Sequence, residues 1–224
     1  ATSHKHPPTG HGGPNMQPVG KPKPPSKSAA IAACAAEIKT TIESIRCNPQ
    51  QVFEIRVPRM PMRFGKPSTS AGWFDDADTL AEEAAKLESN GAPAIYVTLN
   101  ELNPDLLCRA KNRIVERQDS TTADHDIIRR LWLPIDIDPV RPAGISASSD
   151  EIEAARLRTL DVEGWMQDEF QTIPDLRGFS GNGCHLLYRV DLPNSPESTA
   201  GIKGVIDTIA TRFSDNIVSV DRTV

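Results

Sequence analysis

The chain has 224 residues, of which 38% are hydrophobic and 25% are charged, and its formal net charge is −5. This composition is typical of a folded domain with a core, and no apolar run approaches the roughly 18 residues of a membrane-spanning helix. We therefore expect no membrane partner, no export signal and a cytoplasmic location. The acidic balance also argues against a uniformly basic nucleic-acid-binding surface.

The cysteines are far apart in the sequence and include no Cys-x-x-Cys pair; they are Cys34, Cys47, Cys108 and Cys184. Metal-binding and disulfide frameworks usually need closer or paired spacing. The sequence therefore predicts reduced thiols and no zinc site.

The first 28 residues are rich in Pro, Gly, His and Lys and show no hydrophobic period. Such a segment cannot bury enough apolar surface to offset the entropy of ordering, so 1–28 is predicted to be a disordered tail. Its histidines (His4, His6 and His11) are assigned to the tail rather than to a metal site. An alanine-rich helix with undecided packing is expected within 29–50, and 51–224 is expected to form the core.

Strands and helices alternate along the core. Strands are predicted over 52–57, 94–99, 131–137, 177–180, 185–190 and 217–220. Helices are predicted over 76–89, 104–110, 148–170 and 196–212. Ser148 and Glu151 have the spacing of a capping box at the start of the third helix. This order indicates an α/β or α+β fold.

Two groups of basic residues interrupt the acidic average. Arg56, Arg59, Arg63 and Lys66 lie near a single acid, Glu54, and a second group consists of Arg109, Lys111, Arg113 and Arg117. Such runs are usually the solvated faces of separate elements, and contact with nucleic acid is the alternative.

The strand over 131–137 leads into two carboxylates, Asp136 and Asp138. Because side chains alternate along a strand, both project to one face while Ile135 and Ile137 face the core. Two like charges about 7 Å apart repel unless a cation lies between them, and hard oxygen ligands favour Mg²⁺ or Mn²⁺. Solvated acids at a strand end are the alternative interpretation.

Further along the chain, Ser180-Gly-Asn-Gly-Cys-His185 precedes a short apolar run. Gly181 and Gly183 permit positive φ and expose backbone N–H groups to phosphate oxygens. The same Asn-Gly signal predicts a β-hairpin turn, and a hairpin would place His185 beside that loop. A last short strand ends in Asp221, whose alternative interpretation is again a solvated terminus.

The order of acid pair, Gly-rich turn with His, and single acid resembles the three motifs of the archaeo-eukaryotic primase superfamily, in particular the primase-polymerases of phages, plasmids and integrated elements. The resemblance runs from about residue 50 to the end and includes 52–56, 95–100, 121–124, 130–142 and 186–193. It implies an N-terminal α/β unit joined to a catalytic module like the RNA-recognition motif. One departure is the Asp-x-Asp pair, where many relatives carry Asp-x-Glu.

The resemblance also implies an activity: metal-dependent nucleotidyl transfer from NTP or dNTP on a single-stranded DNA template. Asp136, Asp138 and Asp221 would hold two ions of Mg²⁺ or Mn²⁺. His185 would bind nucleotide phosphates together with the backbone around Gly181 and Gly183. Ser180 and Arg141 are further candidates for that pocket, although Arg141 has nearby acids as alternative partners.

The family fold continues past the point that corresponds to Val224, so the resemblance implies a C-terminally truncated core from a larger replication protein, with a helicase domain downstream. Two other functions fit parts of the pattern. A nucleotide-sugar transferase also uses Asp-x-Asp with Mn²⁺ but has no need of the turn that ends in His185. A non-catalytic nucleic-acid-binding module on the same scaffold would not require all three acids.

Overall fold

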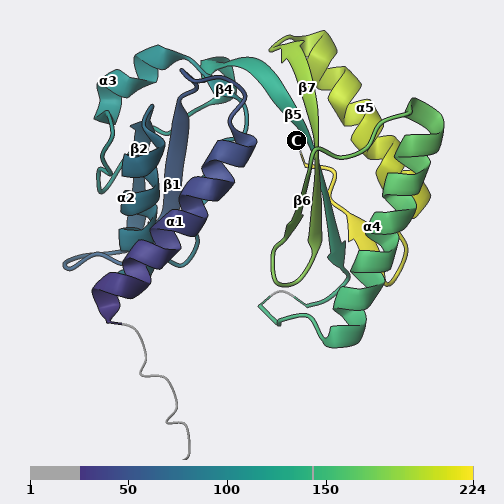
Figure 1. Ribbon diagram of the computed structural model, residues 1–224, viewed down its shortest axis with the longest axis horizontal. Helices are drawn as coiled ribbons and strands as arrows, with labels where there is room; N and C mark the ends of the chain where they lie inside the picture. The colour runs from purple at the N-terminus through teal and green to yellow at the C-terminus, as the bar shows by residue number, and fades with distance from the viewer. Residues whose placement is uncertain (1–25, 143, 224) are drawn as a thin grey trace, which may run out of the picture.

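The computed structural model describes residues 26–142 and 144–223, so the predicted disordered tail lies almost wholly outside the described residues. The chain forms two lobes joined by one long strand, β5 (Ile127–Pro139), as Figure 1 shows. The N-terminal lobe precedes β5, and the C-terminal lobe consists of β5 and all that follows. No helix within these described ranges is long and apolar enough to cross a membrane.

The N-terminal lobe contains a three-stranded antiparallel sheet of order β2-β1-β3. Its strands are β1 (Phe53–Met60), β2 (Ser68–Phe74) and β3 (Tyr96–Val97). Its helices are α1 (Lys27–Ile45), α2 (Ala77–Ser89) and α3 (Leu107–Ala110). Two 3₁₀ turns, η1 (Pro104–Leu106) and η2 (Asp124–Asp126), complete the lobe.

The C-terminal lobe runs β5, α4, β6, β7, α5, β8 in chain order. Its further elements are α4 (Ser149–Phe170), β6 (Leu176–Phe179), β7 (Cys184–Pro193), α5 (Pro196–Phe213) and β8 (Val218–Val220). The strand order is β8-β5-β7-β6 with every neighbour antiparallel, and β4 (Glu101–Leu102) pairs with the start of β5.

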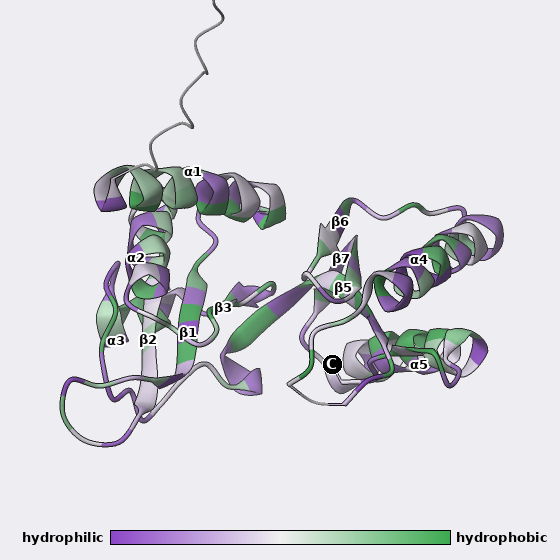
Figure 2. Cartoon of the chain, turned by 90° about the horizontal axis from the view of Figure 1, so that it is seen from below, coloured by the Kyte–Doolittle hydropathy of each residue, from purple (hydrophilic) through white to green (hydrophobic). Residues whose placement is uncertain are grey.

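Both helices of this lobe cover the same face of its sheet (Figure 2). Leu133, Ile135 and Ile137 of β5 are buried in one apolar cluster with residues of α4 and α5. The side chains between them point the other way because a strand has a period of two. We call the face opposite α4 and α5 the open face, and it is turned toward the N-terminal lobe (Figure 1).

A shared apolar cluster joins the two lobes. Trp132 of β5 is 2% exposed and packs in the same cluster as Ile42 and Ile45 of α1. Its indole N–H donates to the carbonyl oxygen of Ile45 at 3.0 Å. The helix expected within 29–50 is thus α1, and its last turn packs against the strand that carries the acid pair.

The helices were predicted more accurately than the strands. The capping box at Ser148 is present, with both of its hydrogen bonds. No element was predicted for 68–74, which is β2, and the strand predicted over 94–99 is regular only over Tyr96–Val97. Because both sheets are antiparallel, the class is α+β rather than α/β.

Candidate functional site

Asp136 and His185 lie directly opposite each other on the open face. They form a register pair between β5 and β7, and His185 Nδ1 is 3.3 Å from Asp136 Oδ1. The two atoms are close but poorly aligned, so Oδ1 is buried without a hydrogen-bond donor. A buried carboxylate oxygen without a donor is costly and suggests that another partner belongs there.

The surroundings of Asp136 disfavour its ionised form. Burial raises the pKa of this carboxyl above its ordinary value, and the charges of Asp138 and Asp221 raise it further. The nearby His185 acts in the opposite direction. Each of the causes that raise this pKa is one that a bound cation would offset.

Asp138 is held between β8 and the turn that precedes β7. It pairs in register with Ser219, and the backbone of Gly183 approaches it closely. A Cβ atom on Gly183 would collide with Asp138 Oδ1 and would lie 2.6 Å from the carbonyl oxygen of Ile137. Glycine at position 183 is therefore a packing requirement of the acid pair.

The Ser180–Gly183 turn is closed by its own groups. The Ser180 hydroxyl oxygen accepts the N–H of Gly183 at 3.0 Å, and the Gly183 carbonyl accepts the N–H of Ser180 at 3.0 Å. Gly181 has φ +91°, the left-handed region that glycine tolerates best. Asn182 accepts the N–H of Ala147 at 2.8 Å, which ties the turn to the segment before α4. Ser180, predicted as a candidate for the nucleotide pocket, thus uses its hydroxyl to organise the turn.

Asp221 is bound to the same strand through its backbone. Its N–H donates to the carbonyl oxygen of Asp136 at 3.0 Å. Its carboxylate, however, accepts the N–H and the hydroxyl of Thr223 at 2.9 and 2.6 Å. These bonds lower the pKa of Asp221. Asp221 therefore lies next to the acid pair, but its carboxylate oxygens are hydrogen-bonded to Thr223.

Arg141 lies on the loop between β5 and α4. Its guanidinium donates to the carbonyl oxygen of Ile145, and its Nε is buried without an acceptor. The hydrogen bonds of Ser148 lower the pKa of Glu151 at the start of α4, and the charge of Arg141 adds to this effect. Arg141 thus contacts its own loop, through the Ile145 carbonyl, and forms no hydrogen bond with the acid pair.

The predicted site residues therefore differ in how closely the structure brings them together. The open face brings together Asp136, Asp138, His185 and Gly183, and Asp221 joins them through its backbone. Across residues 26–142 and 144–223, no three His, Cys, Asp or Glu side chains converge closely enough to enclose a metal ion. The acid oxygens have the chemistry of a hard-cation site, and three of them could bind one ion only after the side chains rotate.

Two residues beside the site were not predicted to belong to it. Ser219 lies between Val218 and Val220, which are buried, and therefore faces the acids from β8. Gly178 of β6 pairs with His185, and a Cβ there would lie 3.5 Å from His185 Cβ. The alternation in Val-Ser-Val is the signal that would have placed Ser219.

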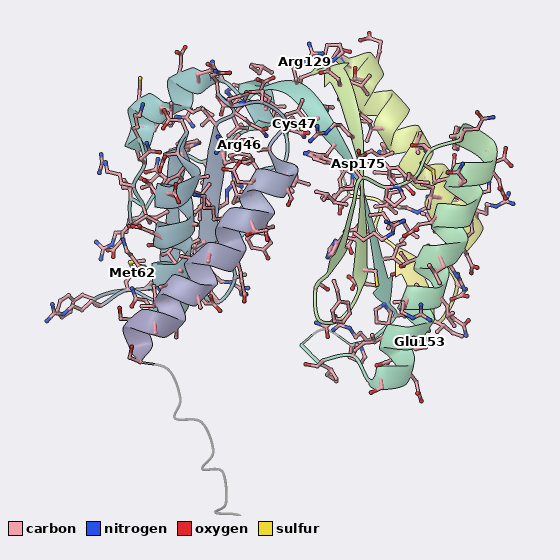
Figure 3. All side chains as sticks on the ribbon, in the orientation of Figure 1. Arg46, Cys47, Met62, Arg129, Glu153 and Asp175 are labelled. Carbon is pink, nitrogen blue, oxygen red and sulfur yellow. The ribbon has the colours of Figure 1, made fainter. Side chains whose placement is uncertain are left out.

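A cavity of about 470 Å³ lies at the opposite end of β7, between the lobes. Among the residues that line it are Cys47, Arg129 and Asp191, and none of the predicted site residues does so. Figure 3 labels Cys47 and Arg129 close to each other where the two lobes meet. Comparisons with models of protein families, with characterised proteins and with solved structures find no match to this chain. The assignment of a function therefore depends on the site itself.

Proposed function

We propose that the chain is the catalytic part of a primase-polymerase that transfers nucleotides to a growing strand on a single-stranded DNA template. The observation that carries the proposal is the meeting of three motifs on one sheet face. Asp136 and Asp138 at the end of β5 lie beside His185 of β7, and the backbone of Asp221 is bonded to Asp136.

The topology of the C-terminal lobe supports this proposal. The order β-α-β-β-α-β, with strands arranged β8-β5-β7-β6 and helices on one face, is the order of a split β-α-β unit, and it supports the proposal of a module like the RNA-recognition motif. In such a unit the face without helices is available to a ligand. Here the acids lie on that face, which is the open face.

The acid pair fits a hard divalent cation in ligand type. Asp136 and Asp138, with Asp221 after rotation away from Thr223, would hold Mg²⁺ or Mn²⁺ in the proposed enzyme. Such ions supply an activated hydroxyl and neutralise charge on the transferred phosphate. The chain's own contribution is to hold two carboxylates on a rigid central strand, with β7 and β8 on either side.

His185 is positioned for an anion by its neighbour. Because Nδ1 lies on the side of Asp136, 3.3 Å from its Oδ1, Nε2 remains for a second partner, and a nucleotide phosphate is the partner we propose. The ring packs over Gly178, where even an added Cβ would meet it only in ordinary contact, at 3.8 Å from Cδ2.

The test is incorporation of labelled nucleotides on single-stranded DNA with Mg²⁺ or Mn²⁺, with and without a primer. Asp136→Asn, Asp138→Asn and Asp221→Asn should each lower the rate at least about a hundredfold, since each removes a carboxylate that would hold the cation by which transition-state charge is offset. Asp161→Asn, on the exposed side of α4, is the matched control and should retain full activity. Near wild-type incorporation by Asp136→Asn would overturn the proposal.

A thermal shift measurement tests metal binding independently of turnover. Millimolar Mn²⁺ should raise the melting temperature of the wild-type chain and of Asp161→Asn, and should raise that of the three site variants much less. An equal shift in all five proteins would show that the ion binds elsewhere.

The bonds between Asp221 and Thr223 favour a second candidate, a nucleic-acid-binding module on the same scaffold without catalysis. In that case Asp221 only stabilises the backbone turn that follows β8, through its bonds to Thr223, and binds no ligand. Metal-independent DNA binding without any incorporation would support this candidate over the enzyme.

A further inference from the structure

The hairpin between β1 and β2 carries an exposed aromatic ring among cations. It spans residues 61–67 and projects from the N-terminal lobe near Met62, on the side of that lobe away from the C-terminal lobe (Figure 3). Phe64 at its tip is 73% exposed. We define the basic hairpin as Phe64 with the cations around it, which are Arg59, Arg63, Lys66 and Arg117.

Local contacts fix the shape of the tip. The guanidinium carbon of Arg63 lies 5.3 Å from the centre of the Phe64 ring. Arg117 donates to the carbonyl oxygen of Phe64 at 2.9 Å. Arg117 can reach this oxygen because 115–118 runs along β2, where Val115 and Ala71 exchange backbone hydrogen bonds. Arg63 thus contacts the ring and Arg117 fixes the backbone at Phe64, while most of the side chain stays exposed.

The charge of the basic hairpin is uncompensated. In the described part of the chain, none of its four cations forms an ion pair with an acid, and the nearest acids in sequence are Glu116 and Asp119 on either side of Arg117. The chain as a whole has a net charge of −5. Two cations on the hairpin, Arg63 and Lys66, and two beside it, Arg59 and Arg117, therefore mark a site for a polyanion on an otherwise acidic protein.

We propose that the basic hairpin binds single-stranded nucleic acid, with phosphates on its cations and one base stacked on Phe64. An exposed ring needs an unpaired base to stack on, which selects a single strand over a duplex. An anionic membrane is the competing partner for such a surface. Membrane binding scales with buried apolar area, and this tip offers only one exposed large hydrophobic side chain, that of Phe64.

This inference adds a second contact surface for the class of ligand that the proposed function uses as template, and binding there does not depend on catalysis, because the hairpin belongs to the other lobe and uses neither metal nor nucleotide. The experiment is therefore done with chelator present. Binding of the full chain to a fluorescein-labelled oligodeoxythymidine of about 20 nucleotides is measured by anisotropy over a series of salt concentrations.

Two variants separate stacking from charge. Phe64→Ala should weaken binding about fivefold to a hundredfold and leave the salt dependence unchanged. Arg63→Gln/Lys66→Gln should reduce the slope of log K against log salt by about 1.4, which is two phosphate contacts at about 0.7 each. The controls are Tyr96→Ala, another exposed aromatic, and Lys27→Gln/Lys203→Gln, which removes two cations elsewhere.

The controls should bind like the wild type, and thermal melting should be the same for all variants because the hairpin side chains are exposed. Hairpin variants that bind like their controls would overturn the proposal. It would also be overturned if these variants lost binding to vesicles containing phosphatidylserine while retaining their affinity for oligodeoxythymidine.

Discussion

Gly183 is the residue on which the position of Asp138 depends most directly. Gly183→Ala would place a methyl group against Asp138 Oδ1 and the Ile137 carbonyl, and neither β5 nor the turn can move without breaking its pairing. We expect incorporation to fall about a hundredfold and the free energy of unfolding to fall by about 1–3 kcal/mol. Steady-state incorporation and urea unfolding measure the two effects.

Gly178→Ala is the matched control for this substitution. Its methyl group would make only ordinary contacts with His185, the nearest at 3.5 Å, and Gly178 has no positive φ. We expect activity within a few-fold of wild type. If both glycine variants lost activity equally, general disturbance of the β6–β7 hairpin would explain the effect better than displacement of Asp138.

His185→Ala should impair nucleotide use more than folding or template binding. One charge-assisted phosphate contact contributes about 1.5–3 kcal/mol, so we expect kcat/KM for nucleotide to fall about tenfold to a hundredfold. The His185 side chain is 39% exposed, so its loss leaves no large cavity. Unchanged kinetic constants, with the same melting temperature as wild type, would remove His185 from the site.

For single residues, the sequence predicted which side chains share a face of the sheet but not which hydrogen bonds each of them forms. The period-two alternation in Ile135-Asp-Ile-Asp138 was sufficient to place both acids on one side of β5. The engagement of Asp221 by Thr223 is an Asx-type turn contact, for which the Asp-x-Thr spacing was an available signal. The role of Ser180 within the turn depends on the backbone of Gly183, which composition alone does not reveal.

Among the elements, β8 is held in place by a charged residue that precedes it. Asp215 accepts the N–H groups of Ile217 and Val218 at 2.7 and 2.9 Å, and Arg158 of α4 donates to it at 2.8 Å. The Arg158 guanidinium, together with these N–H groups, lowers the pKa of Asp215 to about 2. The stabilisation is therefore present above the ordinary pKa near 3.8 and is lost as pH falls toward 2.

Asp215→Asn keeps the shape and one acceptor oxygen but removes the charge that pairs with Arg158. We expect a lower melting temperature than wild type at pH 7, and a difference that shrinks below about pH 4 and disappears near pH 2. Asp150→Asn, an acid in the first turn of α4 without an ion pair in the described residues, is a control for charge. A difference that stayed constant between pH 7 and pH 2 would contradict this assignment.

Strand β2, which was not predicted, shows why the position of a strand was harder to predict than the side on which its residues lie. Ser68-Thr-Ser-Ala-Gly72 lacks the apolar alternation of a strand, and its small residues are there because other chain segments lie against it. A Cβ on Gly72 would collide with the backbone of Arg113, so the segment beside β2 requires glycine. Contacts between segments about forty residues apart are not visible in a local pattern.

In the whole molecule, β5 makes the two lobes one structural unit. Its first residues pair with β4, its last residues pair with β8, and Trp132 between them lies in the core shared with α1. Since this cluster would be exposed by the unfolding of either lobe, the lobes should unfold together. The three tryptophans of the chain allow this to be measured, because Trp73 belongs to the N-terminal lobe and Trp165 to α4.

Trp132→Phe/Trp165→Phe leaves Trp73 as the reporter, and Trp132→Phe/Trp73→Phe leaves Trp165. Phenylalanine in place of Trp132 retains most of the packing, so within each protein the fluorescence and circular dichroism midpoints in urea should coincide. Using Trp132→Ala instead of Trp132→Phe in each pair should lower stability by about a further 3 kcal/mol, since it opens a cavity between α1 and β5. The fluorescence and circular dichroism midpoints should then separate. Midpoints that already differ with the phenylalanine variants, or that still coincide with the alanine variants, would show that Trp132 does not couple the lobes.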